Sequence, residues 1–157
     1  MGGADHMGEP VRIAPATRAD AGEWCALRSA LWPDTSQPEH EEDIGSALAD
    51  EETFNVMARS SDGKALGFAE ATLRHDYVNG TKTSPVVFLE GIYVVPEARG
   101  EGVARALVAA IEAWGRDRGC TEFASDAPIG NEASQAMHAA LGFEETQRVV
   151  YFRKVLG

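Results

Sequence analysis

The residues best suited to chemistry lie in one short glycine-bearing segment, Arg99-Gly100-Glu101-Gly102-Val103-Ala104. We predict a buried strand before this segment and an amphipathic helix after it. The first N–H groups of a helix lack internal partners and lie at the positive end of its dipole, so such a turn can bind phosphate. Gly100 and Gly102 let the backbone approach a ligand closely, and Ala104 keeps the first helical turn narrow. The alternative is a helix N-terminus that packs tightly against a strand and binds nothing.

Two other kinds of phosphate loop do not fit this segment. A nucleoside triphosphate site requires a Gly-Lys-Ser/Thr ending, which is missing here. A dinucleotide-binding fingerprint requires a third glycine, and Arg105 occupies that position. Both of these ligand classes are therefore excluded.

The second half of the chain predicts the elements that position the glycine segment. The apolar run 86–95 suits a central strand buried on both faces. After the glycine turn, apolar residues recur at steps of four, four and three, which predicts a helix that packs on the sheet. Those residues are Val103, Leu107, Ile111 and Trp114. The remaining predicted elements are a short strand over 122–125, a helix over 131–140 and a terminal strand over 148–155.

The first half of the chain predicts three strands and two helices. The apolar stretch 11–14 suits a strand, and Thr17-Arg18-Ala19-Asp20 offers a capping box that begins a helix, which Pro33 ends. The acidic stretch that follows carries Ile44 and Leu48 four residues apart and predicts a second, short helix. The other two predicted strands are 54–59 and 65–73, joined by a hairpin turn at 60–63.

Length and composition predict one mixed α+β domain over 7–157. The chain has 157 residues, of which 44% are hydrophobic and 25% charged, and residues 1–6 look like a cloning remnant. No apolar run approaches the ~20 residues that span a bilayer, and the N-terminus lacks the apolar core of a signal peptide, so a cytoplasmic protein without a membrane partner is expected. Cys25 and Cys120 lie in periodic apolar segments and are expected to be buried thiols.

The charge of the chain favours a cationic partner. A net charge of -11 argues against nucleic acid or an acidic membrane, because phosphate binding requires clustered Lys and Arg. Between positions 39 and 52 the chain has several carboxylates and no Lys or Arg. They are Glu39, Glu41, Glu42, Asp43, Asp50, Glu51 and Glu52. This stretch is either a solvated helical face or an electrostatic funnel for a polycation.

The motif Arg99-x-x-Gly102-x-Ala104 resembles the Arg/Gln-x-x-Gly-x-Gly/Ala signature of the GNAT superfamily of N-acetyltransferases. Asn131 through Leu141-Gly142-Phe143 is similar to the superfamily's second coenzyme A segment. The resemblance implies acetyl-coenzyme A as co-substrate, no metal, and a mixed, mostly antiparallel central sheet flanked by helices, with a splayed central strand pair. The residues that would contact coenzyme A are Ile92, Tyr93, Val94, Arg99, Gly100, Glu101, Gly102, Val103, Ala104, Arg105 and Asn131.

Further segments resemble the aminoglycoside 6'-N-acetyltransferases. They are Leu31-Trp32-Pro33, 75–80, 84–91, 124–126 and 142–146. The resemblance implies transfer of an acetyl group to the 6'-amine of aminoglycoside antibiotics, giving resistance, by a homodimer whose second subunit borders the cleft. The residues that would line the drug-binding cleft are Trp32, Tyr77, Glu90, Asp126 and Gln147, the last in a position where the similar enzymes more often have glutamate.

The residue types in this implied cleft suit the chemistry. An aminoglycoside needs carboxylates for its ammonium groups and aromatic faces for its sugar rings. Its protonated amine must lose a proton before it attacks the thioester, and Asp126 and Glu90 are the candidate bases. A backbone N–H near Val94 would stabilise the negative charge on the former carbonyl oxygen. His138 stands where many GNAT enzymes have a tyrosine acid, and it is the candidate donor to the departing thiolate.

Each candidate also has a purely structural explanation. Glu90 could form an ion pair between strands, Asp126 could cap a helix or turn, and His138 could lie on a helix face without a role. Two other functions stay open at this point. One is a GNAT enzyme that acetylates a polyamine or a protein N-terminus, and the other is a non-catalytic module that binds acyl-coenzyme A and a partner protein.

Overall fold

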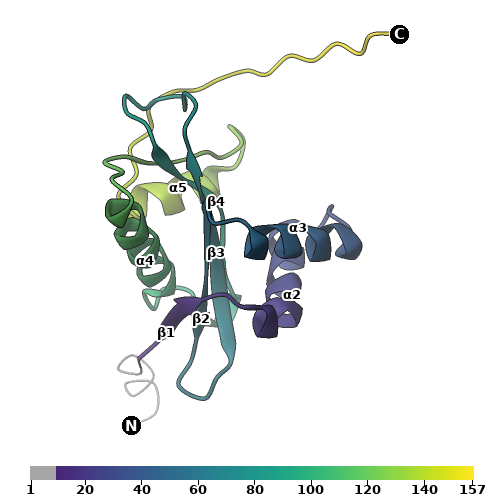
Figure 1. Cartoon of the computed structure of the whole chain (residues 1–157), viewed down its shortest axis with the longest axis vertical. Coiled ribbons are helices and arrows are strands. Elements are labelled where there is room, and N and C mark those ends of the chain that lie inside the picture. The colour runs from purple at the N-terminus through teal and green to yellow at the C-terminus, as the bar shows by residue number, and fades with distance from the viewer. Residues whose placement is uncertain (1–9) are drawn as a thin grey trace.

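The computed structural model describes residues 10–157, so the expected remnant at 1–6 lies outside the described residues. Its centre is a five-stranded sheet in which the strands lie side by side in chain order, shown in Figure 1. The first four strands are antiparallel to one another, and the fifth runs parallel to the fourth. The strands are β1 (Arg12–Pro15), β2 (Thr53–Arg59), β3 (Ala65–Arg74), β4 (Val86–Val94) and β5 (Phe123–Ser125). The predicted mixed, mostly antiparallel sheet is confirmed.

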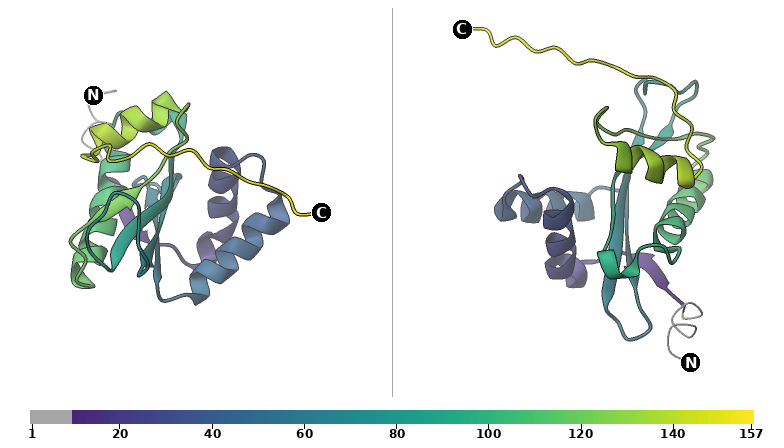
Figure 2. Two further views of the ribbon diagram at one scale, coloured as in Figure 1. Left: turned by 90° about the horizontal axis from the view of Figure 1, so that it is seen from above. Right: turned by 180° about the vertical axis from the view of Figure 1, so that it is seen from behind.

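Helices cover both faces of this sheet. Figures 1 and 2 show α2 and α3 on one side, and α4 and α5 on the other. The helices are α2 (Ala21–Leu31), α3 (Gln37–Ala49), α4 (Val103–Asp117) and α5 (Glu132–Ala140), with two short 3-10 turns, η1 (Arg18–Asp20) and η2 (Pro96–Ala98). The α+β fold class predicted from the sequence is therefore confirmed.

Each face has its own hydrophobic core. On the α4 side, Leu107 and Ile111 are fully buried against the sheet, as the helical spacing of the apolar residues predicted. On the α2–α3 side, Trp24 and Phe68 are the fully buried centre. Cys25 and Cys120 are free buried thiols, one in each core, as expected. Within residues 10–157, no helix is both long and apolar enough to cross a membrane.

Strands β4 and β5 separate after a short stretch of pairing. The pairs run only from Val87 with Phe123 to Leu89 with Ser125, whereas β4 continues to Val94. A register shift against β3 also falls here, because Gly91 pairs with Glu70 and Leu89 with Ala71. Glu90 is thus the extra residue of a β-bulge, which bends a strand and redirects its side chains. The splayed central pair is confirmed, and the bulge lies where the splay begins.

The predicted terminal strand over 148–155 is wrong. Residues 143–157 form neither helix nor strand, and Figure 1 shows them leading away from the body of the molecule. Beyond Phe143, the apolar side chains of this tail are exposed, with Phe152 at 93%. The period-two pattern indicates only that a segment suits a strand. A strand also needs a neighbouring edge to bond, and the tail does not lie against one in its own chain.

Candidate active site

The glycine turn joins the end of β4 to the start of α4 through η2. Gly100 and Gly102 have φ angles of 81° and 85°, in the left-handed region that favours glycine. Gly102 is the N-cap residue, so the first N–H groups of α4 point out of the turn. The side chain of Val103 is buried in the core, which leaves only its backbone to face a ligand, whereas the side chain of Glu101 is exposed.

Two arginines near the turn bond to protein carbonyls. Arg99 Nε donates to the carbonyl oxygen of Val94 at 2.9 Å, and its guanidinium lies 5.4 Å from the centre of the Tyr93 ring. Arg105 Nη2 donates to the carbonyl oxygen of Ala140 at 3.3 Å, which ties α4 to the end of α5. Both side chains therefore hold the elements around the turn together, in addition to the coenzyme contacts expected of them.

The free part of β4 carries the other expected coenzyme contacts. Ile92 is buried in the α4-side core, while Tyr93 and Val94 are half-buried beyond the point where β5 has ended. Asn131 caps α5, because its Oδ1 accepts the N–H of Ser134 at 3.0 Å. That cap satisfies one of the unpaired N–H groups of the helix, so Asn131 has a structural role of its own.

Glu90 forms the ion pair between strands that was considered as its structural explanation. Its Oε2 accepts a hydrogen bond from Thr72 Oγ1 at 2.6 Å and another from Arg74 Nη2 at 2.8 Å. The Arg74 guanidinium also lies 3.7 Å from the centre of the Phe88 ring. Because both donors bind Oε2, a substrate ammonium could approach Oε1. Glu90 is thus a half-exposed carboxylate at the splay that already holds one cation.

His138 is hydrogen-bonded to a serine that the sequence did not single out. Its Nδ1 lies 2.7 Å from the carbonyl oxygen of Ser134, which can only accept, so Nδ1 carries the proton. The other nitrogen, Nε2, then accepts from Ser125 Oγ at 2.8 Å. Ser125 Oγ also lies 3.3 Å from the Leu89 carbonyl, at the last pair between β4 and β5. The Ser125–His138 pair therefore lies at the apex of the splay, and Asp126 follows it with an exposed side chain.

The three other expected cleft residues come from three separate parts of the chain. Trp32 lies directly on β4, because a Cβ added to Gly91 would be 2.5 Å from its ring. Tyr77 is 72% exposed on the loop between β3 and β4. Gln147 is exposed at the start of the tail, and the residue before it, Thr146, lies against Gly80 of that same loop. The structure thus brings Gln147 close to the Tyr77 loop and places Trp32 beside the Glu90 bulge.

The loop that carries Tyr77 is anchored to the residue preceding β5. Glu122 Oε1 accepts the backbone N–H groups of Lys82 and Thr83, each at 2.8 Å, and the Thr83 hydroxyl. These hydrogen bonds, that of the Thr83 side chain first, lower the pKa of Glu122 below its ordinary value. The anchor keeps the base of the loop close to β5 and hence to Asp126.

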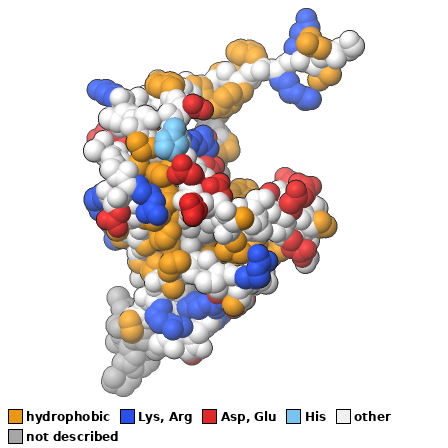
Figure 3. Space-filling model, in the orientation of Figure 1, with side chains coloured by type: hydrophobic (Ala, Val, Ile, Leu, Met, Phe, Trp, Pro, Cys, Tyr) orange, Lys and Arg blue, Asp and Glu red, His pale blue; other side chains and the backbone are white. Residues whose placement is uncertain are grey.

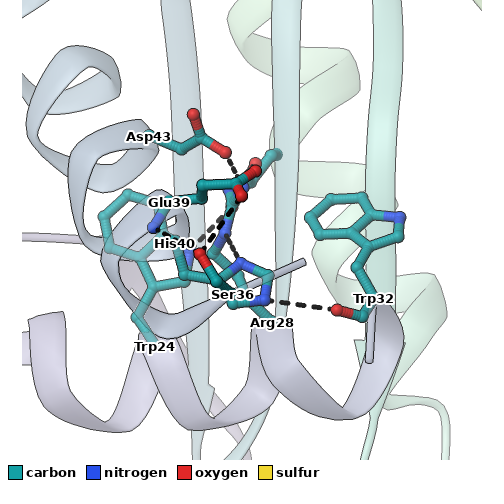
Figure 4. Close-up of polar contacts among 8 residues, drawn as sticks. Trp24, Arg28, Trp32, Ser36, Glu39, His40 and Asp43 are labelled. Atoms are coloured by element: carbon teal, nitrogen blue, oxygen red, sulfur yellow. Dashed lines mark hydrogen bonds and ion pairs between the residues drawn. The ribbon is translucent and has the colours of Figure 1, made fainter. Parts of the chain in front are cut away.

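A largely buried charged network lies beside Trp32 (Figure 4). The Arg28 guanidinium donates three hydrogen bonds. Nη1 donates to Glu70 Oε1 at 2.6 Å, Nη2 to Asp43 Oδ2 at 2.9 Å, and Nε to His40 Nδ1 at 3.1 Å. Trp24 Nε1 also donates to Glu70 at 2.8 Å. Burial raises the pKa of Glu70, while the charge and hydrogen bonds of Arg28 and the hydrogen bond of Trp24 oppose that rise. The network joins α2, α3 and β3 by side chains alone.

The acidic stretch of the sequence lies on and just after α3, and its carboxylates are exposed. Figure 3 shows acidic side chains gathered at the far end of α3 and over the strands beside it, with a hollow between α3 and the outgoing tail. Two members of the stretch are paired, Asp43 with Arg28 and Glu52 with His75. The others are free to raise the local concentration of a cation near the hollow.

Known proteins match both this fold and this sequence. The model of the acetyltransferase (GNAT) family matches residues 21–143, which include β2 to β5, the glycine turn and α5. The chain belongs to the GNAT family. Among described residues, no group of three or more His, Cys, Asp or Glu is placed to hold a metal ion.

Several GNAT relatives match over nearly their whole length. An aminoglycoside N(6')-acetyltransferase type 1 from Stenotrophomonas maltophilia is 54% identical, with 92% of this chain and 93% of the relative covered. The crystal structure of aminoglycoside 6'-N-acetyltransferase AAC(6')-Ih from Acinetobacter baumannii superposes with a TM-score of 0.90 at 44% identity, covering 94% and 100% of the chains. The structure of AAC(6')-Iy in complex with the bisubstrate analogue CoA-S-monomethyl-acetylneamine superposes with a TM-score of 0.88 at 45% identity. The match covers 94% of this chain and 99% of that one.

Three residues that contact the candidate site residues were not found by reading the sequence. Ser125 and Arg74 bond to partners that come from other strands or helices, His138 and Glu90, and no local pattern marks such pairs. Arg28 left a weak signal, because it is a charged residue four positions after Trp24 on the apolar face of the predicted helix. A charge on such a face requires a buried partner, but the sequence does not say which residue that is.

Proposed function

We propose that this chain transfers the acetyl group of acetyl-coenzyme A to the 6'-amine of aminoglycoside antibiotics and so confers resistance to them. The observation that carries the proposal is the splay of β4 from β5, with the glycine turn at one end and the Glu90 bulge at the other. Relatives of this name that match over nearly their whole length support the choice of acceptor. Because acetyl-coenzyme A is a cytoplasmic metabolite, we place the reaction in the cytoplasm, carried out by residues 7–157 as one domain.

The α4 side of the splay is the proposed site for acetyl-coenzyme A. The pyrophosphate would accept hydrogen bonds from the N–H groups of Gly102, Val103 and Ala104 at the positive end of α4. The pantetheine arm would lie along Ile92, Tyr93 and Val94, whose backbone has no β5 partner. An N–H near Val94 would then donate to the oxygen that becomes negative during acyl transfer.

The acceptor would enter from the opposite side, between Trp32, the Tyr77 loop and the tail. Glu90 and Asp126 would bind its ammonium groups, and Trp32 and Tyr77 would pack on its rings. The 6'-ammonium must lose a proton before it attacks. One of these carboxylates would take that proton, either directly or through a bridging water. Gln147 would offer a neutral hydrogen bond instead of a charged one.

Ser125 and His138 would carry the second proton transfer. In the resting state Nε2 of His138 accepts from the Ser125 hydroxyl. Once His138 has taken up a proton that originates on the substrate amine, Nε2–H donates to Ser125 Oγ, and the Ser125 hydroxyl proton can pass to the sulfur as the carbon–sulfur bond breaks. The pair ends the cycle as it began, and one proton has moved from nitrogen to sulfur.

We infer that the active form is a homodimer in which the tail of each copy binds the other copy. The tail presents Val150, Tyr151, Phe152 and Leu156 to solvent, and such a concentration of exposed apolar side chains is typical of an interface. β5 is the last strand of the sheet, so its outer edge can accept an added strand. The tail leads away from its own body, which favours an edge in a second copy (Figure 2).

The acceptor is tested with neomycin and paromomycin, which differ by a 6'-amine against a 6'-hydroxyl. The chain is incubated with acetyl-coenzyme A and each drug, and mass spectrometry follows a gain of about 42 Da, the difference between an amine hydrogen and an acetyl group. We expect neomycin to be acetylated at its 6'-amine and paromomycin, which has a hydroxyl there, to stay unmodified at that position. If neither drug is modified but spermidine or a peptide N-terminus is, the acceptor proposal is wrong.

Two substitutions test the assigned roles. Asp126→Asn and Glu90→Gln are each expected to lower kcat/KM for neomycin about tenfold to a hundredfold, since each removes a carboxylate that binds or deprotonates the amine. The affinity for acetyl-coenzyme A, measured by calorimetry, is expected to stay unchanged. If the cofactor affinity falls instead, these carboxylates belong to the other half of the site.

The dimer is tested by truncation after Gln147. Light scattering should give the mass of two 16.8-kDa chains for the full chain and of one chain for the truncated protein. If the tail folds back onto its own β5, both proteins will be monomers and the dimer proposal fails.

A further inference from the structure

The Trp32 indole occupies a restricted position on the acceptor side of β4. Its six-membered ring lies where a side chain at position 91 would be, 2.5 Å from the place of an added Cβ. Its centre lies 6.2 Å from that of Phe68, in an edge-to-face arrangement. Gly91 pairs with Glu70, and Glu90 bonds to Thr72 two residues further along β3, so the ring and the carboxylate to which we assign an ammonium group lie on the same face of the sheet.

Two residues that are remote from the acceptor hold Trp32 in this position. The Arg28 guanidinium lies 4.8 Å from the centre of the indole ring. Nε2 of His40 lies 3.2 Å from the Trp32 carbonyl oxygen, and Nδ1 of the same ring lies 3.1 Å from Arg28 Nε. Because an arginine N–H can only donate, Nδ1 must accept, so Nε2 carries the proton and donates to Trp32. His40 therefore connects the side chain and the backbone contacts of Trp32 (Figure 4).

The hydrogen bond from His40 is not required to end the helix. The Trp32 carbonyl also accepts the N–H of Thr35 at 3.2 Å, and the Trp32 N–H bonds to the carbonyl of Arg28 at 2.7 Å. These backbone contacts already form the turn between α2 and α3. His40 is nevertheless 0% exposed, and burying a polar ring is costly unless both nitrogens are bonded. Its position is thus explained by the connection it makes between Arg28 and Trp32.

We propose that His40 is a positioning residue for acceptor binding, which fixes the Trp32 indole against Gly91 so that it forms a rigid wall of the acceptor site. The inference rests on the proposed function, because it assumes that the acceptor packs on Trp32. A ring that is fixed before binding loses little freedom when the drug packs on it, whereas a mobile ring must be ordered by the drug. His40 should therefore affect the affinity for the acceptor without touching it.

Three variants separate positioning from stability. His40→Leu removes both hydrogen bonds, and His40→Gln keeps an acceptor for Arg28 and a donor for Trp32. Ile44→Ala is the matched control, because Ile44 is buried on the same helix and lies in the same core but makes no hydrogen bond to Trp32. We expect KM for neomycin to rise about fivefold to tenfold in His40→Leu and to return to within about twofold in His40→Gln.

In all three variants KM for acetyl-coenzyme A is expected to stay near that of the unmodified chain. Ile44→Ala should lower Tm while leaving KM for neomycin unchanged. An equal rise of KM for neomycin in Ile44→Ala, or no rise in His40→Leu, would overturn the proposal.

A second measurement needs no substrate. The indole N–H signal of Trp32 is assigned in an ¹H–¹⁵N spectrum from its loss in Trp32→Phe. His40→Leu should shift and broaden this signal, and His40→Gln should restore it. An unchanged signal would show that His40 does not hold the ring. If the signal changes but neomycin is not acetylated by the unmodified chain, the positioning of the ring stands and the assigned acceptor is what fails.

Discussion

The two faces of the sheet carry sites of different construction. On the α4–α5 face, the site consists of backbone groups: a left-handed glycine turn, the N-terminus of α4 and the unpaired part of β4. On the α2–α3 face, the structure depends on side chains distant in sequence, with Arg28 bonded to Glu70, 42 positions away. The first face should therefore be sensitive to changes of backbone conformation, and the second to the loss of single charged groups.

Arg28→Met should give the largest effect, on the side-chain-built face. Glu70 would keep its burial but lose its charged partner, and breaking a buried ion pair in this way costs about 3–5 kcal/mol of unfolding free energy. Urea denaturation measures the loss. Arg116→Met is the control, because its ion pair with Glu112 is exposed and should contribute less than about 0.5 kcal/mol. A loss in Arg28→Met as small as in the control would contradict the importance of buried charge on this face.

Gly102→Ala should give the next largest effect, on the backbone-built face. A Cβ at this position meets no atom within 4 Å, so the cost comes from the left-handed conformation alone, about 1–2 kcal/mol. Any relaxation of the turn also moves the N–H groups of α4, so KM for acetyl-coenzyme A should rise while KM for neomycin does not. Gly22→Ala is the control, since Gly22 has equal space but a helical φ. Equal effects of the two substitutions would remove the distinction between the faces.

This difference also explains which parts could be predicted from the sequence. The α4 helix, the glycine turn and the strand before it follow from local spacing, because the same few neighbouring residues determine conformation and burial. The network of Arg28, His40 and Glu70 could not be predicted, because it depends on how α2, α3 and β3 pack together. The tail was wrongly predicted as a strand for the same reason, since its residues suit a strand but the partner edge is not encoded locally.

Arg74→Gln should have a smaller effect. This substitution changes the partner of Glu90, the extra residue of the β4 bulge. The Arg74 guanidinium bonds to Glu90 Oε2 and would compete with an ammonium at Oε1 for the charge of this carboxylate, so its removal should lower KM for neomycin. An exposed ion pair contributes about 0.2–1 kcal/mol, which corresponds to a change of no more than about fivefold. Arg116→Gln removes the same charge from the exposed side of α4 and controls for the overall change of potential. An equal fall in both variants would show that Arg74 does not compete at Glu90.

Glu122→Gln should have the smallest effect. The site of this substitution combines the two kinds of construction, because the Glu122 side chain accepts hydrogen bonds from the backbone N–H groups of Lys82 and Thr83. The hydrogen bond from the Thr83 hydroxyl, together with these backbone bonds, lowers its pKa in the folded chain below the ordinary value of 4.5. The stabilisation is therefore fully present above pH 4.5 and is lost as the pH falls through the lower pKa of the folded state. The Tm difference between the two proteins should be constant near pH 7 and shrink on acidification. A difference that does not change with pH would mean that the charge of Glu122 does not hold the loop.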